Sequence, residues 1–249
     1  MSRSSPQHAT DRVAAPDAAG VSPAAANLNA TLQTASPADI ITAALRTVGR
    51  DRLAVVSSFG TESAALLKVV ADVDAAIPVI FLETGWLFDE TLAYRDTLIA
   101  ALGLTDVRSI KPLQQALALE DPDRDLWFAN PDACCFLRKV EPLARALAPF
   151  SAWINGRKRF QGGARAALPV VEPDGARLKF NPFANVTPED IKAIYAQAKL
   201  PPHPLVAAGF MSVGCMPCTS RTAPGEDSRA GRWRGRGKTE CGIHEAPDL

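Results

Sequence analysis

Five cysteines are the residues of this chain with the greatest capacity for chemistry. Cys134 and Cys135 are adjacent, Cys215 and Cys218 form a Cys-x-x-Cys turn, and Cys241 stands alone near the end. Thiolates bind soft metals and act as nucleophiles. We therefore interpret Cys134, Cys135, Cys215 and Cys218 as four ligands of one metal centre, and Cys241 as a free thiol that reacts.

The spacing of the four ligands favours an iron–sulfur cluster over a zinc ion. Zinc sites usually take each ligand pair from a turn in which other residues separate the two cysteines. The adjacent thiolates of Cys134 and Cys135 would strain the chelation of one tetrahedral ion, whereas a cubane cluster offers each thiolate its own iron. Zinc, and four thiols without metal, are the alternatives.

The segment around Cys241 combines cations, glycines and a histidine. Arginine makes bidentate contacts with phosphate, so the segment could close on a phosphorylated ligand, and its glycines favour mobility. His244 follows Cys241 by three residues and could position the thiol or supply a proton. A strand-binding or disordered tail is the alternative. The cations are Arg221, Arg229, Arg232, Arg234, Arg236 and Lys238.

A polar turn between an apolar run and an apolar helix predicts an anion site. Residues 53–57 are typical of a buried strand, and residues 64–70 of a helix. The turn between them reads Ser57-Ser-Phe-Gly-Thr-Glu-Ser63. Such a turn directs backbone N–H groups and the positive end of the helix dipole at an anion. An ordinary strand–helix turn is the alternative.

The rest of the chain continues the alternation of strands and helices. It predicts an α/β fold with a parallel sheet, right-handed crossovers and helices on both faces. Ligands of such sheets lie beyond the carboxyl ends of the strands. The loops after residues 82 and 155 should therefore adjoin the Ser57 turn. Further strands are predicted at 77–82, 107–110, 152–155 and near 179–182, and helices begin near 37, 89, 134 and 187.

Composition limits the setting of the protein. The 249 residues carry no formal net charge, so global charge predicts neither a nucleic-acid nor a membrane partner. No secretory signal is evident, which indicates a reducing, cytoplasmic location. We predict a disordered leader at 1–36 with a short helix near 24–32, one domain at 37–220, and a mobile tail at 221–249. Asp11 and Asp17 argue against a transit peptide. A homo-oligomer is left open.

Taken jointly, the motifs resemble those of assimilatory adenylyl-sulfate reductases, the iron–sulfur branch of the phosphoadenylyl-sulfate/adenylyl-sulfate (PAPS/APS) reductase family. The similarity spans residues 57–244. It rests on the Ser57–Ser63 turn, Cys134-Cys-x-x-Arg-Lys139, Gly214-Cys-x-Pro-Cys-Thr219, Pro224-Gly-Glu-Asp227, Arg229-Ala-Gly-Arg-Trp233 and Glu240-Cys-Gly-Ile-His244.

The resemblance implies an adenine nucleotide alpha hydrolase-like (PP-loop) fold with a flexible C-terminal tail. It implies reduction of adenosine 5′-phosphosulfate to sulfite and AMP, in the sulfate assimilation that feeds cysteine biosynthesis. Cys241 would attack the sulfur and form an S-sulfocysteine (thiosulfonate), which thioredoxin or a similar dithiol would resolve. A [4Fe-4S] cluster would have an electrostatic and structural role.

The resemblance also implies the substrate-binding residues. They are Ser57, Ser58, Phe59, Gly60, Glu62, Ser63, Thr84, Gly85, Lys139, Arg159, Arg229 and Arg232. The chain departs from the common family pattern at Glu83, Trp86, Phe160, Val206 and Arg234, which affects the adenosine pocket more than the chemistry. A PAPS reductase, favoured by the extra cation Arg157, and a PP-loop ATP pyrophosphatase that thiolates RNA are the alternative functions.

Overall fold

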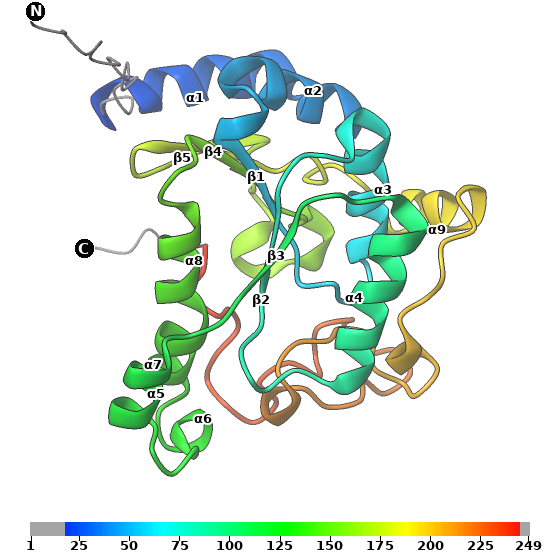
Figure 1. Ribbon diagram of the computed structural model, residues 1–249. Coiled ribbons are helices and arrows are strands. Elements are labelled where there is room, and N and C mark those ends of the chain that lie inside the picture. Colours follow the sequence, from blue (N-terminus) through cyan, green and yellow to red (C-terminus); the bar gives the residue numbers. More distant parts are fainter. Residues whose placement is uncertain (1–17, 245–249) are drawn as a thin grey trace, which may run out of the picture.

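The computed structural model describes residues 18–244, with side chains from residue 22 onward. Its centre is a six-stranded sheet in the order β3-β2-β1-β4-β6-β5, covered by helices on both faces (Figure 1). All neighbouring strands are parallel except β5 and β6, so the predicted parallel α/β sheet is confirmed. The strands are β1 Leu53–Val56, β2 Val79–Leu82, β3 Val107–Ile110, β4 Ala152–Ile154, β5 Val171–Asp174 and β6 Arg177–Phe180.

The helices occupy both sides of this sheet. On one side α2 packs on β1, β4 and β6, with α3, α4 and α9 beside it, and on the other α8 packs on β2 and β3. The helices are α1 Ala18–Leu32, α2 Pro37–Val48, α3 Ser63–Asp74, α4 Asp89–Leu102, α5 Gln114–Glu120, α6 Leu126–Ala129, α7 Pro131–Cys135, α8 Glu141–Leu147 and α9 Pro188–Gln197. A π-helical turn, Phe136–Val140, joins α7 to α8.

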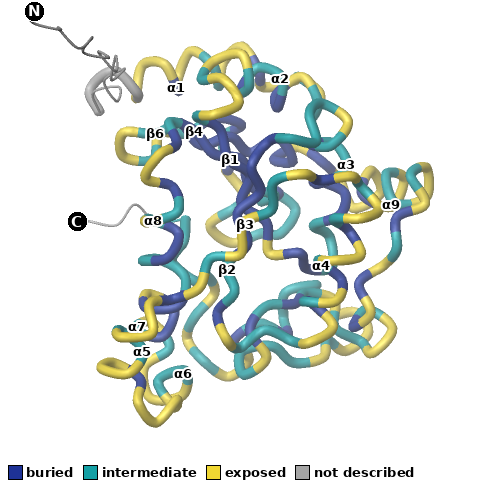
Figure 2. The backbone as a smooth tube through the Cα atoms, in the orientation of Figure 1, coloured by how far each residue is buried: buried dark blue, intermediate teal, exposed yellow. Residues whose placement is uncertain are grey.

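The central strands divide their side chains between two cores. Leu53 and Val55 of β1 belong to the larger core, whereas Ala54 and Val56 belong to a smaller core with Trp153 of β4. Successive side chains of a strand point to opposite faces, so a strand covered on both sides is apolar throughout. Figure 2 shows β1 buried along its length. This explains why the strand reads as a continuous apolar run.

Capping residues define the helix starts that the sequence predicted. Ser36 caps α2 by accepting a hydrogen bond from the Asp39 N–H, and Pro37 occupies the first turn. Thr187 and Asp190 form a reciprocal capping box at the start of α9. Each side chain satisfies a backbone donor that the first helical turn leaves free. Both predicted helix starts are confirmed.

The N-terminal segment departs from the predicted disordered leader. Residues 18–32 form α1, a longer helix than the expected one near 24–32, and it packs on β5 and β6. Ala25 and Leu32 are buried in the larger core, and the Asn29 side chain accepts hydrogen bonds from the Val170 and Val171 N–H groups. The helix covers an edge hairpin that would otherwise expose its face. Residues 1–17 of the predicted leader lie outside the described residues.

The strand order places a topological switch point between β1 and β4. From β1 the chain proceeds through β2 to β3 on one side, and it then returns to β4 on the other side of β1. The loops after β1 and β4 therefore diverge and leave a crevice at the carboxyl edge of the sheet. In Figure 1 the orange and red C-terminal segment lies along this edge.

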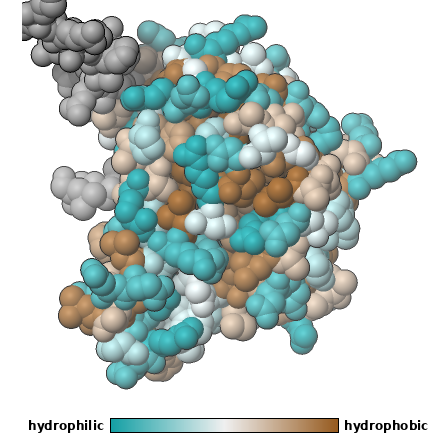
Figure 3. Space-filling view, viewed as in Figure 1, coloured by the Kyte–Doolittle hydropathy of each residue, from teal (hydrophilic) through white to brown (hydrophobic). Residues whose placement is uncertain are grey.

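Exposed apolar side chains gather on α5 and α6. Leu119 of α5 and Phe128 of α6 are 78% and 71% exposed, and Figure 3 shows apolar groups over these helices at the lower left. Large exposed apolar patches are common at protein contacts. The structure holds a single chain, so the homo-oligomer stays a prediction. Between residues 18 and 244, no helix is both long and apolar enough to cross a membrane.

Candidate active site

A cavity of about 210 Å³ occupies the crevice at the switch point. One side of the cavity comes from the Ser57–Ser63 turn and from residues 155–158 after β4. The other side comes from residues 212–214 and from the C-terminal segment, which contributes lining residues between positions 229 and 244. Loops that are distant in the sequence thus meet at one end of the sheet, as the parallel topology requires. The predicted anion-binding turn and the predicted nucleophile Cys241 line the same cavity.

The Ser57–Ser63 turn is held open by its own hydroxyl groups. Ser57 Oγ accepts from the Phe59 N–H at 3.2 Å, and Ser63 Oγ accepts from the Gly60 N–H at 3.0 Å. Phe59 adopts φ 48° and packs its ring edge-on against Phe81 in the core. Phe59 therefore shapes the turn from below, while Ser57, Ser58, Gly60, Glu62 and Ser63 line the cavity.

Thr84 and Lys139 connect this cavity to the cysteines. Thr84 lines the cavity and its Oγ1 lies 3.3 Å from Cys215 Sγ. Burial acts to lower the pKa of Lys139, but negative charge at Cys215 and Cys241 raises that pKa overall. Lys139 therefore remains charged beside the sulfurs of Cys215 and Cys241.

Gly85, by contrast, does not line the cavity; it turns the chain at φ 75° beside Arg138.

The C-terminal segment brings arginines over the cavity. The backbones of Thr219 and Arg232 form an isolated antiparallel β-bridge, and the Trp233 N–H donates a hydrogen bond to the Cys218 carbonyl. The C-terminal segment therefore folds back on the Cys215 turn. The Arg232 guanidinium packs directly on Gly214, where a Cβ would collide with it. It also donates to the Val213 carbonyl at 3.2 Å. Only glycine at position 214 leaves room for this arrangement.

Cys241 lies among cations in the same cavity. Lys139, Arg165, Arg229 and Arg232 line the cavity together with Cys241. A cationic setting stabilises thiolate nucleophiles. Cys241 is partly exposed, which leaves the sulfur accessible from the cavity.

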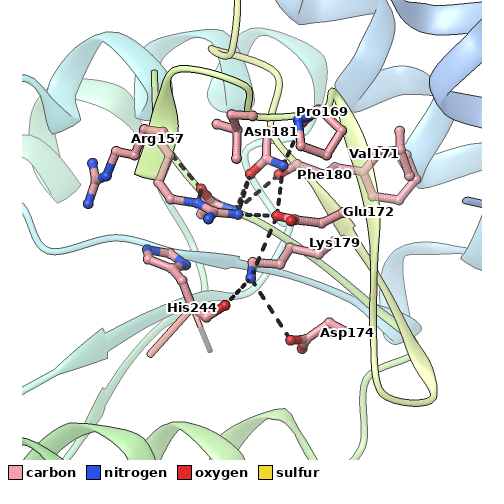
Figure 4. A network of polar contacts seen from close by, with 12 residues as sticks. Arg157, Pro169, Val171, Glu172, Asp174, Lys179, Phe180, Asn181 and His244 are labelled. Atoms are coloured by element: carbon pink, nitrogen blue, oxygen red, sulfur yellow. Dashed lines mark hydrogen bonds and ion pairs between the residues drawn. The ribbon is translucent and has the colours of Figure 1, made fainter. Parts of the chain in front are cut away.

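His244 is anchored to the sheet beyond Cys241. Its ring stacks on Trp153 with centroids 5.7 Å apart, and its carbonyl accepts from Lys179 Nζ at 3.0 Å (Figure 4). Burial, followed by the charges of Arg157 and Lys179, holds the pKa of His244 well below its usual value. The imidazole is therefore neutral at pH 7 and resists protonation, which suits the predicted positioning role better than the predicted supply of a proton.

Figure 4 shows the network that supports this anchor. Glu172 of β5 pairs with Arg157 and lies 3.6 Å from Lys179 Nζ, while Asp174 lies 3.9 Å from the same nitrogen. Arg157 Nη2 also donates to Asn181 Oδ1 at 3.2 Å. The buried cations therefore have acidic partners from the edge hairpin, which offsets the cost of burying them.

Four of the five cysteines surround a second, smaller cavity. Cys134 and Cys135 come from α7, and Cys215 and Cys218 come from the turn that follows Gly214. Within the described residues, no group of three His, Cys, Asp or Glu side chains is arranged to hold a single metal ion. The four predicted ligands nevertheless line one common space, as a shared metal centre requires.

The lining of this cavity also fits a sulfur-rich group. Three buried donors of its lining residues have no partner among the described residues: Trp86 Nε1, Trp233 Nε1 and Arg138 Nε. Unpartnered buried donors are costly unless an acceptor completes them. Burial, followed by the charge of Cys135, raises the pKa of Cys134 to about 12. Four thiolates this close need positive charge to offset them, which irons would supply.

The comparisons with known proteins identify the family of the chain. Residues 52–221 match the model of the phosphoadenosine phosphosulfate reductase domain, well over half of the chain. The chain belongs to this reductase family.

Relatives and solved structures extend the family assignment. The chain is 54% identical to the adenosine 5′-phosphosulfate reductase of Mesorhizobium japonicum, over 90% of this chain and 89% of the relative. It is 43% identical to the phosphoadenosine 5′-phosphosulfate reductase of Gloeobacter violaceus, over 84% and 88%. The crystal structure of the phosphoadenylyl-sulfate (PAPS) reductase of Candida auris matches with TM-score 0.66 at 27% identity, covering 79% of this chain and 96% of that one.

The reductase fold brings together most of the predicted site residues. Lys139, Arg229, Arg232, Cys241 and His244 line the cavity with the serine-rich turn and Thr84. Arg159 does not: it donates to the Leu168 carbonyl at 2.7 Å and contacts Asn185, away from the cavity. Its direction follows from the 3-10 turn that begins at this residue. Arg159 is structural here, which differs from its predicted substrate contact.

Several residues that line the cavity of the reductase were not predicted from the sequence. Lys158 donates to Glu62 at 2.7 Å, and Gln161 donates to the same carboxylate at 3.2 Å. Arg165 lines the cavity and pairs with Glu240. Their position in the loop after a parallel strand was the available signal, because that loop faces the ligand crevice.

Proposed function

We propose that this chain reduces adenosine 5′-phosphosulfate to sulfite and AMP in assimilatory sulfate reduction, with Cys241 as the nucleophile. The observation that carries the proposal is one cavity lined by both the Ser57–Ser63 turn and Cys241, with cations between them. Membership of the reductase family and the relatives named for this activity support the same reaction.

The proposed reaction proceeds by sulfonyl transfer to the thiolate. The Cys241 sulfur attacks the sulfur of the phosphosulfate group, an S–S bond forms, and the bond between that sulfur and the bridging oxygen breaks. AMP leaves with the electron pair of the broken bond. Lys139, Arg229 and Arg232 stabilise the charge on the phosphate and sulfate oxygens, and they orient the group for attack.

A dithiol then completes the cycle. One thiolate of thioredoxin or a similar dithiol attacks the sulfur of Cys241, so sulfite leaves and a mixed disulfide forms. The second thiol of the reductant attacks that disulfide and frees Cys241. The reductant is oxidised by two electrons, which the sulfur receives on its way to sulfite. The tail must expose Cys241 to the reductant, so we propose that the segment anchored through His244 swings out during this step.

We propose that Cys134, Cys135, Cys215 and Cys218 hold a [4Fe-4S] cluster. When bound, the cluster supplies a fixed charge and a structural bridge between α7 and the Cys215 turn. Lys139 and Thr84 lie on the side of the cysteines that faces the cavity, so they couple this charge to the substrate region. In this scheme the cluster would have an electrostatic and structural role and would not relay electrons.

The environment of Arg157 favours the substrate without a 3′-phosphate. Arg157 is the extra cation that kept the PAPS alternative open, and its guanidinium is already paired with Glu172 and bonded to Asn155 and Asn181. A 3′-phosphate would have to compete with these partners. One relative named as a PAPS reductase keeps that activity as the second candidate.

Turnover on the two nucleotides tests the proposal. The protein is expected to form sulfite and AMP from adenosine 5′-phosphosulfate with thioredoxin, at a kcat/KM well above that for the 3′-phosphorylated nucleotide. Cys241→Ser should abolish sulfite formation while nucleotide binding and the visible absorbance of a cluster persist. A preference for the 3′-phosphorylated nucleotide, or wild-type turnover by Cys241→Ser, would contradict it.

A further inference from the structure

Glu240, the residue before Cys241, lies in the cavity as the partner of two arginines. Its carboxylate accepts hydrogen bonds from Arg165 at two points, from Nε to Oε1 at 2.7 Å and from Nη2 to Oε2 at 2.8 Å. Arg229 Nη2 lies 3.4 Å from Oε2. Such a fork of parallel N–H donors binds phosphate and related oxyanions in the same way as carboxylate.

The acidic residues of the cavity differ in where they come from. Among residues 18–244, two acids line it, Glu62 and Glu240. Glu62 belongs to the turn after β1 and pairs with Lys158 of the loop after β4, so both partners are part of the scaffold. Glu240 instead comes from the C-terminal segment and neutralises an arginine of the scaffold. Its carboxylate can therefore leave without disturbing the sheet.

Without an anion, the two arginines would be poorly compensated. The side chains of Arg165 and Arg229 are only 11% and 17% exposed, and burial, followed by the positive charge of Arg165, lowers the pKa of Arg229. Buried like charges are costly unless an opposite charge offsets them. The Glu240 carboxylate provides that charge in the absence of a ligand.

We propose that Arg165 and Arg229 form an oxyanion-binding subsite that Glu240 fills when no substrate is present. The proposal rests on the proposed function, which supplies a ligand with phosphate and sulfate oxygens. These oxygens and the Glu240 carboxylate compete for the same guanidinium N–H groups. Glu240 turns away as the substrate enters. The apparent Kd for the substrate equals the intrinsic Kd divided by the fraction of molecules in which Glu240 has left the subsite.

Binding to chains that cannot turn over measures this competition. In a Cys241→Ser background, adenosine 5′-phosphosulfate should bind Glu240→Gln with a Kd about three- to tenfold lower than the parent, because the competing charge is gone. Adenosine, which carries no oxyanion, should bind both chains equally. Glu240→Ala provides the same comparison if Glu240→Gln does not fold, as judged by circular dichroism and thermal unfolding.

Asp132→Asn is the matched control. Asp132 belongs to α7 and pairs with Lys238, which lies on the same C-terminal segment as Glu240. The Asp132 side chain is 84% exposed and does not line the cavity. Its loss should loosen the segment without freeing the subsite, so the Kd for adenosine 5′-phosphosulfate should stay within about twofold of the parent.

Each other outcome has a defined meaning. Equal or weaker binding of adenosine 5′-phosphosulfate by the Glu240 variants would overturn the subsite. So would an equal gain in Asp132→Asn or an equal gain for adenosine, because general loosening of the tail would then account for the effect. A folded parent that binds neither compound would refute the proposed function together with the subsite.

Discussion

Replacing Gly214 by alanine tests how the fold holds Arg232 over the cavity. A Cβ at this position would meet Arg232 Cζ at 2.5 Å and Nη1 at 2.8 Å, with Nη2 closer still. Real side chains do not tolerate such contacts, so one partner must move. Arginine is flexible, and its guanidinium moves more easily than the backbone. The substitution should therefore displace Arg232 from the cavity and leave the chain folded.

The expected effects on stability and on binding differ in size. Gly214 is not among the glycines with positive φ, so alanine adds little backbone strain, and it reduces the entropy of the unfolded chain. We expect the free energy of unfolding to change by less than about 1 kcal/mol. Loss of one hydrogen bond to a charged ligand costs about 1.5–3 kcal/mol. This weakens affinity by about 10- to 150-fold.

Calorimetric titration of adenosine 5′-phosphosulfate into Cys241→Ser chains measures this loss. Gly237→Ala is the matched control, since a Cβ there meets nothing within 4 Å. Arg232→Ala should weaken binding as Gly214→Ala does, and the double variant should be no weaker than either alone, because both remove one contact. Unchanged affinity in Gly214→Ala, or additive losses in the double variant, would refute the reasoning.

Two further predictions concern stability. Burial lowers the pKa of His203 to about 4. Between pH 6.5 and pH 4 the imidazole is therefore protonated in the unfolded state but neutral in the folded state. The free energy of unfolding should fall by about 1.4 kcal/mol per pH unit as the pH decreases from 6.5 to 4. His203→Gln should remove that slope from pH-dependent urea denaturation, and an unchanged slope would exclude His203 as its source. Asn29→Ala leaves the Val170 and Val171 N–H groups without their acceptor, so it should destabilise the protein by about 1–3 kcal/mol. Thermal unfolding tests this, and a melting temperature equal to wild type would show that α1 does not depend on this contact.

The central sheet could be predicted because its signals are local. Residues 53–56 and 107–110 are short runs bounded by turns, and their alternation with helices dictates parallel pairing. The edge strand β5 was not predicted, since Pro173 and its acidic neighbours are typical of a loop. An edge strand tolerates proline because one side of its backbone needs no partner. Its pairing with β6 depends on tertiary contacts.

The helix α1 was predicted only in part, as a short helix near 24–32 in a disordered leader, for a similar reason. Its buried side chains include the small Ala25, which contributes little to an apolar pattern, and its specific contact is polar: Asn29 accepts hydrogen bonds from the Val170 and Val171 N–H groups at the start of β5. Helices of this kind gain their stability from docking rather than from propensity. Composition alone therefore suggested disorder where the fold provides a surface.

The candidate site was predictable in its loops but not in its ion pairs. The Ser57 turn had to lie at the carboxyl edge of the sheet, and Cys241 was marked by being the unpaired fifth cysteine. The pairing of Arg165 with Glu240 depends on how the tail folds back over 75 residues of sequence separation. No local pattern encodes that contact. The same holds for His244, whose stacking on Trp153 places it on the sheet.

Intact mass spectrometry tests the central claim that Cys241 is the nucleophile. The protein is incubated with adenosine 5′-phosphosulfate and no reductant, then weighed and digested. We predict the mass gain of one SO₃ group, located on the peptide that contains Cys241, removed by thioredoxin with release of sulfite, and absent from Cys241→Ser. An unmodified protein that has nevertheless formed AMP and sulfite, or a sulfonate on another cysteine, would contradict the account.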